Sequence, residues 1–272
     1  MPVQPEIQPL SRAKRKIIAD LATRHGRERR GLFRLEGPRA IEDAIARGAR
    51  FRCLVVNEDG APWVERWAQA GLVGDGVEVY RAPGAELDAL ADTATTQGVV
   101  AIGDLPSQGV AGLPADLGRL VLLADGVQDP GNLGTLFRTL VAVGGRTAIL
   151  CRGTVDPFNP KALRGAAGAT FDLAIAAGLD RGAAIDLLTE RGIAVVAMAA
   201  GMPSLFEASI PQGPLALAVG NEGGGLGAEI QDRAALVVGL PMAPAVESLS
   251  AAVAGSIAMY ALAYRLRSGG PE

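Results

Sequence analysis

The second half of the chain consists of short, uninterrupted apolar runs that alternate with stretches of helical periodicity. The first run, residues 120–124 (LVLLA), contains no polar residue and is typical of a strand buried on both faces of a parallel sheet. Further strands are predicted at 147–151, 193–198, 214–219 and 235–240, and helices at 132–143, 181–191, 226–233 and 248–266. This alternation predicts an α/β domain with a mostly parallel sheet covered on both faces, whose ligands bind beyond the carboxyl ends of the strands.

The first hundred residues show a smaller alternation. Helices are predicted at 11–24, 37–46, 62–70 and 86–91, and strands at 51–56, 76–80 and 99–102. That order fits a small α/β sandwich. Residues 105–118 collect Gly, Pro and Ser without periodicity and are expected to form a linker. Two domains are therefore expected, residues 1–104 and 119–272, which a chain of 272 residues can accommodate.

Composition argues against several classes of protein. One His and two Cys, Cys53 and Cys151, leave no zinc-ligand spacing and no disulfide framework, so no metal is expected. Residues 1–10 contain Glu6 and three prolines but no apolar core of a signal peptide, which favours a cytoplasmic location. Residues 248–264 carry no charge, yet they are rich in Ala and Ser and too short for a membrane span. A buried helix is expected there, and no membrane partner.

Positive charge is concentrated at the start of the chain. Residues 1–52 hold 13 Lys and Arg against 6 Asp and Glu, although the net charge of the whole chain is −3. A basic block of this kind attracts polyanions such as nucleic acids. A solvated helix face would account for it equally well, so charge alone leaves both interpretations open.

A glycine-rich loop follows one of the predicted strands. Residues 220–227 read GNEGGGLG, and a backbone so rich in glycine can approach a ligand closely and offer it N–H groups. The loop lacks the GK[ST] of a P-loop. Gly223, Gly225 and Ala228 match a loose dinucleotide fingerprint, which keeps a nicotinamide-dependent oxidoreductase as an alternative. The short helix that follows and the absence of an acidic residue at the end of the next strand argue against that alternative.

Three segments after residue 120 occur in a characteristic order. They are residues 125–139 (DGVQDPGNLGTLFRT), the loop 220–227, and residues 240–250 (LPMAPAVESLS). Together they closely resemble the three motifs of the SpoU, or TrmH-like, RNA ribose methyltransferases of the SPOUT class. Residues 30–46 and 96–102 resemble the N-terminal RNA-binding domain of that family, which is similar to ribosomal protein L30e.

The resemblance implies an activity and an assembly. The implied reaction is 2′-O-methyl transfer from S-adenosylmethionine to RNA, with ribosomal RNA preferred over transfer RNA. The implied enzyme is a homodimer whose C-terminal domain contains a trefoil knot. An RNA-binding module with a decayed transferase site is the alternative from a different class, because Ser250 stands where the family has Asn.

The resemblance also assigns roles to residues of the three motifs. The resemblance implies that Asn132 and Arg138 face the RNA and the transferred methyl, with Arg138 as the base favoured in the family. Our own hypothesis is that Arg138 orients a phosphate and stabilises negative charge, since a guanidinium stays protonated at neutral pH and is a poor base. Ser250 would cap the final helix. The residues carried over as catalytic are Asn132, Arg138, Glu222 and Ser248, and those carried over as cofactor-binding are Gly220, Leu240, Met242 and Leu249.

Two further groups of residues are singled out for binding. The candidate RNA contacts in the basic first part of the chain are Arg24, Arg27, Arg29, Arg30 and Arg39. Apolar residues recur at helical spacing near the C-terminus, at Leu249, Val253, Ile257, Tyr260 and Tyr264. We expect this stripe to pack the last helix on the sheet, and the family resemblance implies that the helix also takes part in the dimer.

Overall fold

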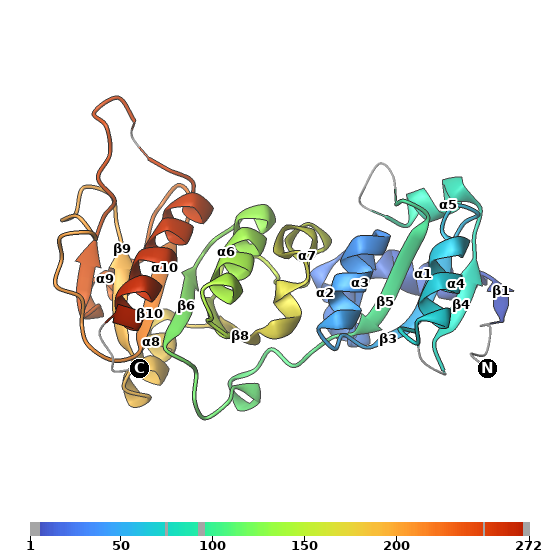
Figure 1. Cartoon of the computed structure of the whole chain (residues 1–272), viewed down its shortest axis with the longest axis horizontal. Helices are drawn as coiled ribbons and strands as arrows, with labels where there is room; N and C mark the ends of the chain where they lie inside the picture. Colours follow the sequence, from blue (N-terminus) through green and yellow to red (C-terminus); the bar gives the residue numbers. More distant parts are fainter. Residues whose placement is uncertain (1–5, 74–75, 92–95, 247, 269–272) are drawn as a thin grey trace. The chain divides into compact units, whose positions relative to one another are not determined.

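The computed structural model describes residues 6–73, 76–91, 96–246 and 248–268. The chain folds into two compact units. The first unit combines Met1–Pro106 with the later segment Asp156–Phe171, and the second combines Ser107–Val155 with Asp172–Glu272 (Figure 1). The chain therefore passes between the units three times.

The first unit is built on a mixed five-stranded sheet. Its strands are, in spatial order, β1 (Ile7–Pro9), β4 (Glu78–Arg81), β3 (Phe51–Val56), β5 (Val99–Asp104) and β2 (Leu32–Glu36). β1, β4 and β3 are parallel, whereas β5 runs antiparallel to both β3 and β2. The helices are α1 (Arg12–Asp20), α2 (Arg24–Arg30), α3 (Pro38–Ala46), α4 (Ala61–Gln69) and α5 (Gly84–Ala89). The small α/β domain expected from the sequence is present, with β2 as a strand that its periodicity did not indicate.

Alternation along β3 explains how this sheet is covered. Leu54 and Val56 face a core shared with α3 and α4, whereas Cys53 and Val55 face a core shared with α1 and α5. Both faces are thus buried under helices, which is why residues 53–56 (CLVV) of this strand form a continuous apolar run.

The segment 156–171 completes the first unit although it comes from the second half of the chain. It contains α7 (Pro160–Ala166), and Phe158 and Leu163 are buried in the same core as α3 and α4. Asp156 accepts hydrogen bonds from the guanidinium of Arg27, whose side chain is 2% exposed. A buried ion pair and two apolar side chains therefore anchor this segment on the first unit.

The second unit contains a six-stranded sheet that is parallel throughout. Its strands are, in spatial order, β11 (Leu236–Val238), β9 (Ala194–Met198), β10 (Leu215–Gly220), β6 (Leu120–Asp125), β7 (Thr147–Cys151) and β8 (Ala174–Leu179). The parallel sheet predicted from the apolar runs is confirmed. β8 was not indicated by the sequence, because its run AIAAGL is only partly buried.

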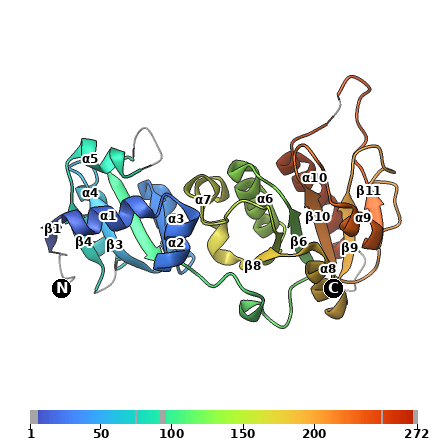
Figure 2. The same cartoon turned by 180° about the vertical axis from the view of Figure 1, so that it is seen from behind.

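Helices cover both faces of this sheet. Val121 and Leu123 point to the face covered by α8 (Arg181–Glu190) and α9 (Ala228–Arg233), which is best seen in Figure 2. The other face carries α6 (Pro130–Ala142) and α10 (Ala251–Ser268), which lie side by side in Figure 1. Gly255 permits this close packing, since a Cβ there would lie 2.5 Å from the Leu136 side chain.

The last helix packs differently from the expectation. Ala258, Met259 and Leu262 are buried, whereas the stripe predicted to face the sheet lies exposed, with Tyr260 and Tyr264 at 58% and 74%. The prediction that this stripe packs α10 on the sheet is therefore wrong, because Ala, Met and Leu residues on the opposite side of the helix make those contacts. No helix among the described residues is long and apolar enough to cross a membrane.

Candidate functional site

The site lies where the direction of chain progression across the parallel sheet reverses. β6 and β10 are neighbours, and their last residues, Asp125 and Gly220, are paired in register. The loops that leave these two strands therefore begin side by side. Crevices at such points are where open α/β sheets bind ligands.

A buried carboxylate ties the glycine-rich loop to the sheet. The Asp125 side chain is fully buried and accepts a hydrogen bond of 2.8 Å from the backbone N–H of Gly227. Both of its carboxylate oxygens also accept from Nε of Arg181, at 2.9 and 3.0 Å. Gly227 must be glycine here, because a Cβ would lie 2.4 Å from that Nε. The end of the glycine-rich loop, at the N-cap of α9, is thus held at the end of β6.

Asn221 joins the two loops directly. Its side-chain amide donates a hydrogen bond of 2.8 Å to the carbonyl oxygen of Gly126, which lies in the loop after β6. Its side-chain oxygen accepts from the backbone N–H groups of Gly223 and Gly224 at 2.8 and 2.9 Å. One side chain thus shapes the glycine turn and attaches it to the loop after β6.

Glu222 makes a second connection between these loops. Its carboxylate accepts from the side-chain amide of Asn132 at 2.9 Å and from the backbone N–H groups of Gln128 and Asp129. Partial burial raises the pKa of this carboxyl, but the hydrogen bonds outweigh burial and hold its pKa below the ordinary value. Glu222 is therefore anionic at neutral pH and orients Asn132, which lies in the first turn of α6 behind the N-cap Asp129.

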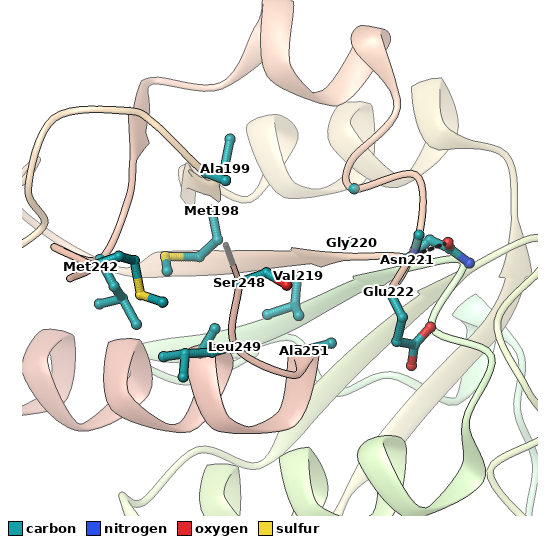
Figure 3. A pocket seen from close by; sticks show the side chains of 15 residues that line it. Met198, Ala199, Val219, Gly220, Asn221, Glu222, Met242, Ser248, Leu249 and Ala251 are labelled. Atoms are coloured by element: carbon teal, nitrogen blue, oxygen red, sulfur yellow. Dashed lines mark hydrogen bonds between the residues drawn. The ribbon is translucent and has the colours of Figure 1, made fainter. Parts of the chain in front are cut away.

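A cavity of about 410 Å³ opens beside these loops. Figure 3 shows Met198 and Met242 at one end of it and Asn221 and Glu222 at the other. Six of the residues predicted from the motifs line this cavity, namely Gly220, Glu222, Leu240, Met242, Ser248 and Leu249. Two of the three motif segments, 220–227 and 240–250, therefore meet at one cavity.

The chemistry of the cavity walls suits a nucleoside-like molecule. Val219, Leu240 and Leu249 offer apolar surface of the kind that holds a flat base, and the glycine-rich backbone leaves room close to the main chain. Gly220 is required for this shape, because a Cβ there would lie 2.3 Å from the backbone carbon of Gly225. Ser248 and Glu222 supply polar groups at the rim.

Two motif residues lie outside the cavity wall. Asn132 is connected to the site through Glu222, whereas Arg138 is exposed on α6, six residues further along the helix. Thr139, the next residue, shares a hydrogen bond of 2.8 Å with Ser256 of α10. Arg138 thus lies on the part of α6 that borders α10, and its predicted role on the substrate stays a prediction.

Ser250 occupies the start of α10 as the sequence predicts. Its hydroxyl accepts from the backbone N–H of Val253 at 3.3 Å, and its carbonyl oxygen accepts from Ala254 at 2.9 Å. This is the geometry of a helix N-cap. The residue that replaces the family Asn therefore keeps a structural role next to the cavity wall formed by Ser248 and Leu249.

The arginines predicted to contact RNA have different environments. Arg24, Arg29 and Arg30 lie at the surface of the first unit, where Arg24 pairs with Glu28 and the other two pair with Asp20. Arg27 is buried, and its guanidinium is bound by Asp156 and by the carbonyl oxygen of Leu21. The prediction that Arg27 contacts RNA is therefore wrong, because its charge is used inside the fold. Exposed Arg39 lines a separate cavity in the first unit.

Several residues that shape the site were not singled out from the sequence. Asp125, Arg181 and Asn221 organise the loops, and Met198 contributes to the wall. An acidic residue that directly follows an apolar strand, as Asp125 does, was a signal that could have been used. Arg181 gave no such signal, since its role depends on the place of α8 beside the end of β6.

The chain matches two protein-family models. The SpoU rRNA Methylase family matches residues 119–260, and the MRM3-like substrate binding domain matches residues 13–101. Among curated relatives, the 23S rRNA (guanosine(2553)-2′-O)-methyltransferase RlmP of Bacillus subtilis (strain 168) is 32% identical over 259 residues. That alignment covers 94% of this chain and 98% of the relative.

Solved structures give the same result. The SpoU methyltransferase AviRb from Streptomyces viridochromogenes, in complex with the cofactor AdoMet, has a TM-score of 0.85 at 25% identity, covering 96% of this chain and 100% of that one. The AdoMet-bound rRNA methyltransferase from Sinorhizobium meliloti has a TM-score of 0.83 at 27% identity, covering 97% and 99%. The predicted fold class is confirmed, and this likeness supports the predicted knot. With a family model across half its length and a near full-length relative, the chain belongs to the SpoU rRNA methylase family.

Proposed function

We propose that the protein transfers the methyl group of S-adenosylmethionine to a ribose 2′-hydroxyl of ribosomal RNA. The observation that carries this proposal is the cavity beyond β9 and β10, which residues of the second and third motifs line and to which Glu222 connects Asn132 of the first motif. The relatives support the substrate and the cofactor, since RlmP is named as a ribosomal RNA 2′-O-methyltransferase and AviRb was solved with AdoMet. Family membership argues against the nicotinamide-dependent alternative.

The residues that would hold the cofactor are those of the cavity wall. Leu240 and Leu249 would contact its base, and the backbone at Gly220 would border its sugar. The cofactor supplies a methyl group that is already activated by a sulfonium. The protein's task is therefore to align the acceptor hydroxyl and to assist loss of its proton.

The chain provides groups for that task. The Glu222 carboxylate holds the Asn132 amide in one orientation at the rim, so that Asn132 can direct a ribose without reorganising. Ser248 presents a hydroxyl from the opposite wall. Arg138 would bind an RNA phosphate and stabilise charge that develops on the acceptor oxygen.

We infer further that the active protein is a homodimer formed through α10. Val253, Ile257, Tyr260 and Tyr264 are exposed apolar residues on one helix, and exposed Leu249 continues them to the cavity. Contiguous apolar surface of this kind marks interaction sites. Sedimentation should give a dimer for the wild type and a monomer for Ile257→Glu, and a monomeric wild type would contradict this inference.

Within this proposal the first unit presents the RNA, as its match to a substrate binding domain supports. Ribosomal RNA as substrate implies a protein that works in the cytoplasm. Transfer RNA is the alternative substrate, and the experiment below compares methyl transfer to the two kinds of RNA.

The experiment that tests the function measures methyl transfer and maps its position. Purified protein is incubated with labelled S-adenosylmethionine and either ribosomal or transfer RNA from cells that lack the gene. We expect label in ribosomal RNA and one ribose methylation that is missing without the gene. RNA binding without incorporation would instead favour the decayed transferase site suggested by Ser250.

A further inference from the structure

The first unit contains a second cavity, which takes no part in the proposed methyl transfer. Its volume is about 320 Å³. Three segments line it: the end of β2 with the first turn of α3, Gln97 before β5, and α7 with Ala167. The cavity therefore forms only because the segment 156–171 packs on the first unit.

One arginine in this cavity is fixed by a buried carboxylate. Glu36, whose side chain is 1% exposed, accepts from Nη1 of Arg164 at 3.3 Å and pairs with the buried Arg34 through its other oxygen. The Arg164 side chain is 30% exposed and lines the cavity. A guanidinium has five N–H donors, so this bond leaves others for a ligand. Glu36 thus holds a cation in place at the cavity wall.

A second arginine and the start of a helix add to this positive site. Arg39 is exposed, lines the same cavity and lies in the first turn of the nine-residue helix α3. The N-cap, Gly37, has no side chain to cap the helix, and Pro38 has no N–H, so the donors that the first turn can offer are the backbone amides of Arg39 and Ala40. Asp43 also lines the cavity, so a phosphate bound there would face one carboxylate beside the two arginines.

The backbone around the cavity is unusual. Gln97 and Ala167 have φ values of +50° and +46°, and they are the only non-glycine residues with positive φ in the part of the chain that the structure describes. Both line this cavity. Ala167 is the C-cap of α7, where a left-handed residue commonly ends a helix, and Gln97 lies in the turn before β5.

We propose that this cavity binds a nucleotide of the substrate RNA through its phosphate, which Arg39 and Arg164 hold together. Two guanidiniums suit a phosphate because each can donate two parallel hydrogen bonds. The inference rests on the proposed function and adds a binding site distant in sequence from the three motifs. According to this proposal, Arg164 of the inserted segment 156–171 contacts the RNA together with residues of the first hundred.

The test compares arginine variants of the full-length protein. Binding of a fluorescent 23S ribosomal RNA transcript is measured at several salt concentrations for wild type, Arg39→Gln, Arg164→Gln and Arg164→Lys. Arg52→Gln is the matched control, because Arg52 also pairs with a carboxylate, Asp104, but lies outside the cavity. Affinity for S-adenosylmethionine is measured in parallel.

We expect Arg39→Gln and Arg164→Gln each to weaken RNA binding roughly tenfold and to lower the salt dependence by about one phosphate contact. The RNA affinity of Arg164→Lys should lie between that of the glutamine variants and that of the wild type. The affinity for S-adenosylmethionine should be the same in all of these proteins. Arg39 is exposed, so its variant tests the site even if Arg164→Gln fails to fold.

Different outcomes separate this inference from the proposed function. If the wild type methylates ribosomal RNA while both glutamine variants bind RNA as Arg52→Gln does, only the cavity assignment is wrong. Free AMP or inorganic phosphate that binds as tightly as RNA, with the same arginine dependence, would show a small-molecule site instead. If the wild type neither binds nor methylates RNA, both proposals fail.

Discussion

The two cavities described above are constructed in different ways. In the second unit, β6 and β10 are parallel neighbours, so their following loops emerge together and Asn221 and Glu222 need only short bonds to join them. In the first unit the sheet is mixed, and α7, more than a hundred residues away in sequence, closes the cavity. Topology alone assembles one site, whereas the other depends on a segment inserted from elsewhere in the chain.

This difference implies different sensitivities to mutation. The cavity of the second unit should tolerate loss of a single connection, because Asp125, Asn221 and Glu222 make separate bonds between the same loops. The cavity of the first unit depends on how firmly 156–171 is anchored. Single substitutions in each unit can therefore test the contrast.

The largest effect is expected at the anchor of the inserted segment. Asp156→Ala leaves the Arg27 guanidinium buried without its carboxylate, and breaking a buried pair in this way costs about 3–5 kcal/mol. Denaturant unfolding should show this loss of stability. Asp180→Ala, which removes an exposed pair with Arg152, is the control and should change stability by less than about 1 kcal/mol. Equal stability of the two variants would show that the Arg27–Asp156 pair does not anchor the inserted segment.

A smaller effect is expected at Glu222. Glu222→Gln replaces one accepting oxygen by an NH₂ group that faces the N–H donors of Asn132 and Asp129. The rate of methyl transfer should fall roughly 30-fold, about 2 kcal/mol. RNA affinity should change little, since the first unit is untouched. A variant with wild-type rate would show that the oriented Asn132 is not needed.

The lowered pKa of Glu222 adds a pH dependence. The pKa of the Glu222 carboxyl in the folded protein lies below the ordinary value of 4.5. The hydrogen bonds that this carboxylate accepts therefore stabilise the fold fully above about pH 4.5, and this stabilisation is lost as the pH falls through the folded-state pKa. The difference in unfolding free energy between wild type and Glu222→Gln should therefore be constant near neutral pH and shrink in acid. A difference that grows in acid would contradict the assigned bonds.

The next effect concerns Arg181. Arg181→Gln removes one partner of Asp125 but leaves the Gly227 amide, and Arg181 is about half exposed, so solvent can compensate in part. We expect affinity for S-adenosylmethionine to drop roughly tenfold, about 1.4 kcal/mol, with RNA affinity unchanged. Arg152→Gln, at an exposed pair near the start of the same helix, should leave both affinities as they are. A loss confined to RNA binding would place Arg181 in a different role.

The sequence predicted the location of the cavity in the second unit better than that of the cavity in the first unit, and the reason is the difference in topology. Apolar runs predict parallel strands, and parallel strands place their following loops together, so the loop 220–227 could be expected at a ligand-binding edge of the sheet. The roles of Gly220, Glu222 and Leu249 came instead from the resemblance to the SpoU family. The burial of Arg27 could not be foreseen, because its partner Asp156 lies 129 residues away and no local pattern links them.

The outward-facing stripe of α10 was missed for another reason. Helical spacing of large apolar residues does not say which surface covers them. Here Gly255 lets α10 approach α6 closely, and Met259 and Leu262 fill the buried side, so the predicted stripe lies on the other side of the helix. That exposed stripe is the surface through which we propose that two copies associate.

The smallest predicted effect concerns the cap of α10. Ser250→Ala removes the hydroxyl that accepts from Val253 and should lower stability by about 1 kcal/mol. Ser250→Asn should keep the stability, because Asn caps helices as well as Ser does. If the family Asn has a catalytic role that Ser cannot fill, Ser250→Asn should also raise the rate of methyl transfer, measured with labelled cofactor. An unchanged rate with unchanged stability would mean that, in this chain, the position serves only to begin the helix beside Ser248 and Leu249.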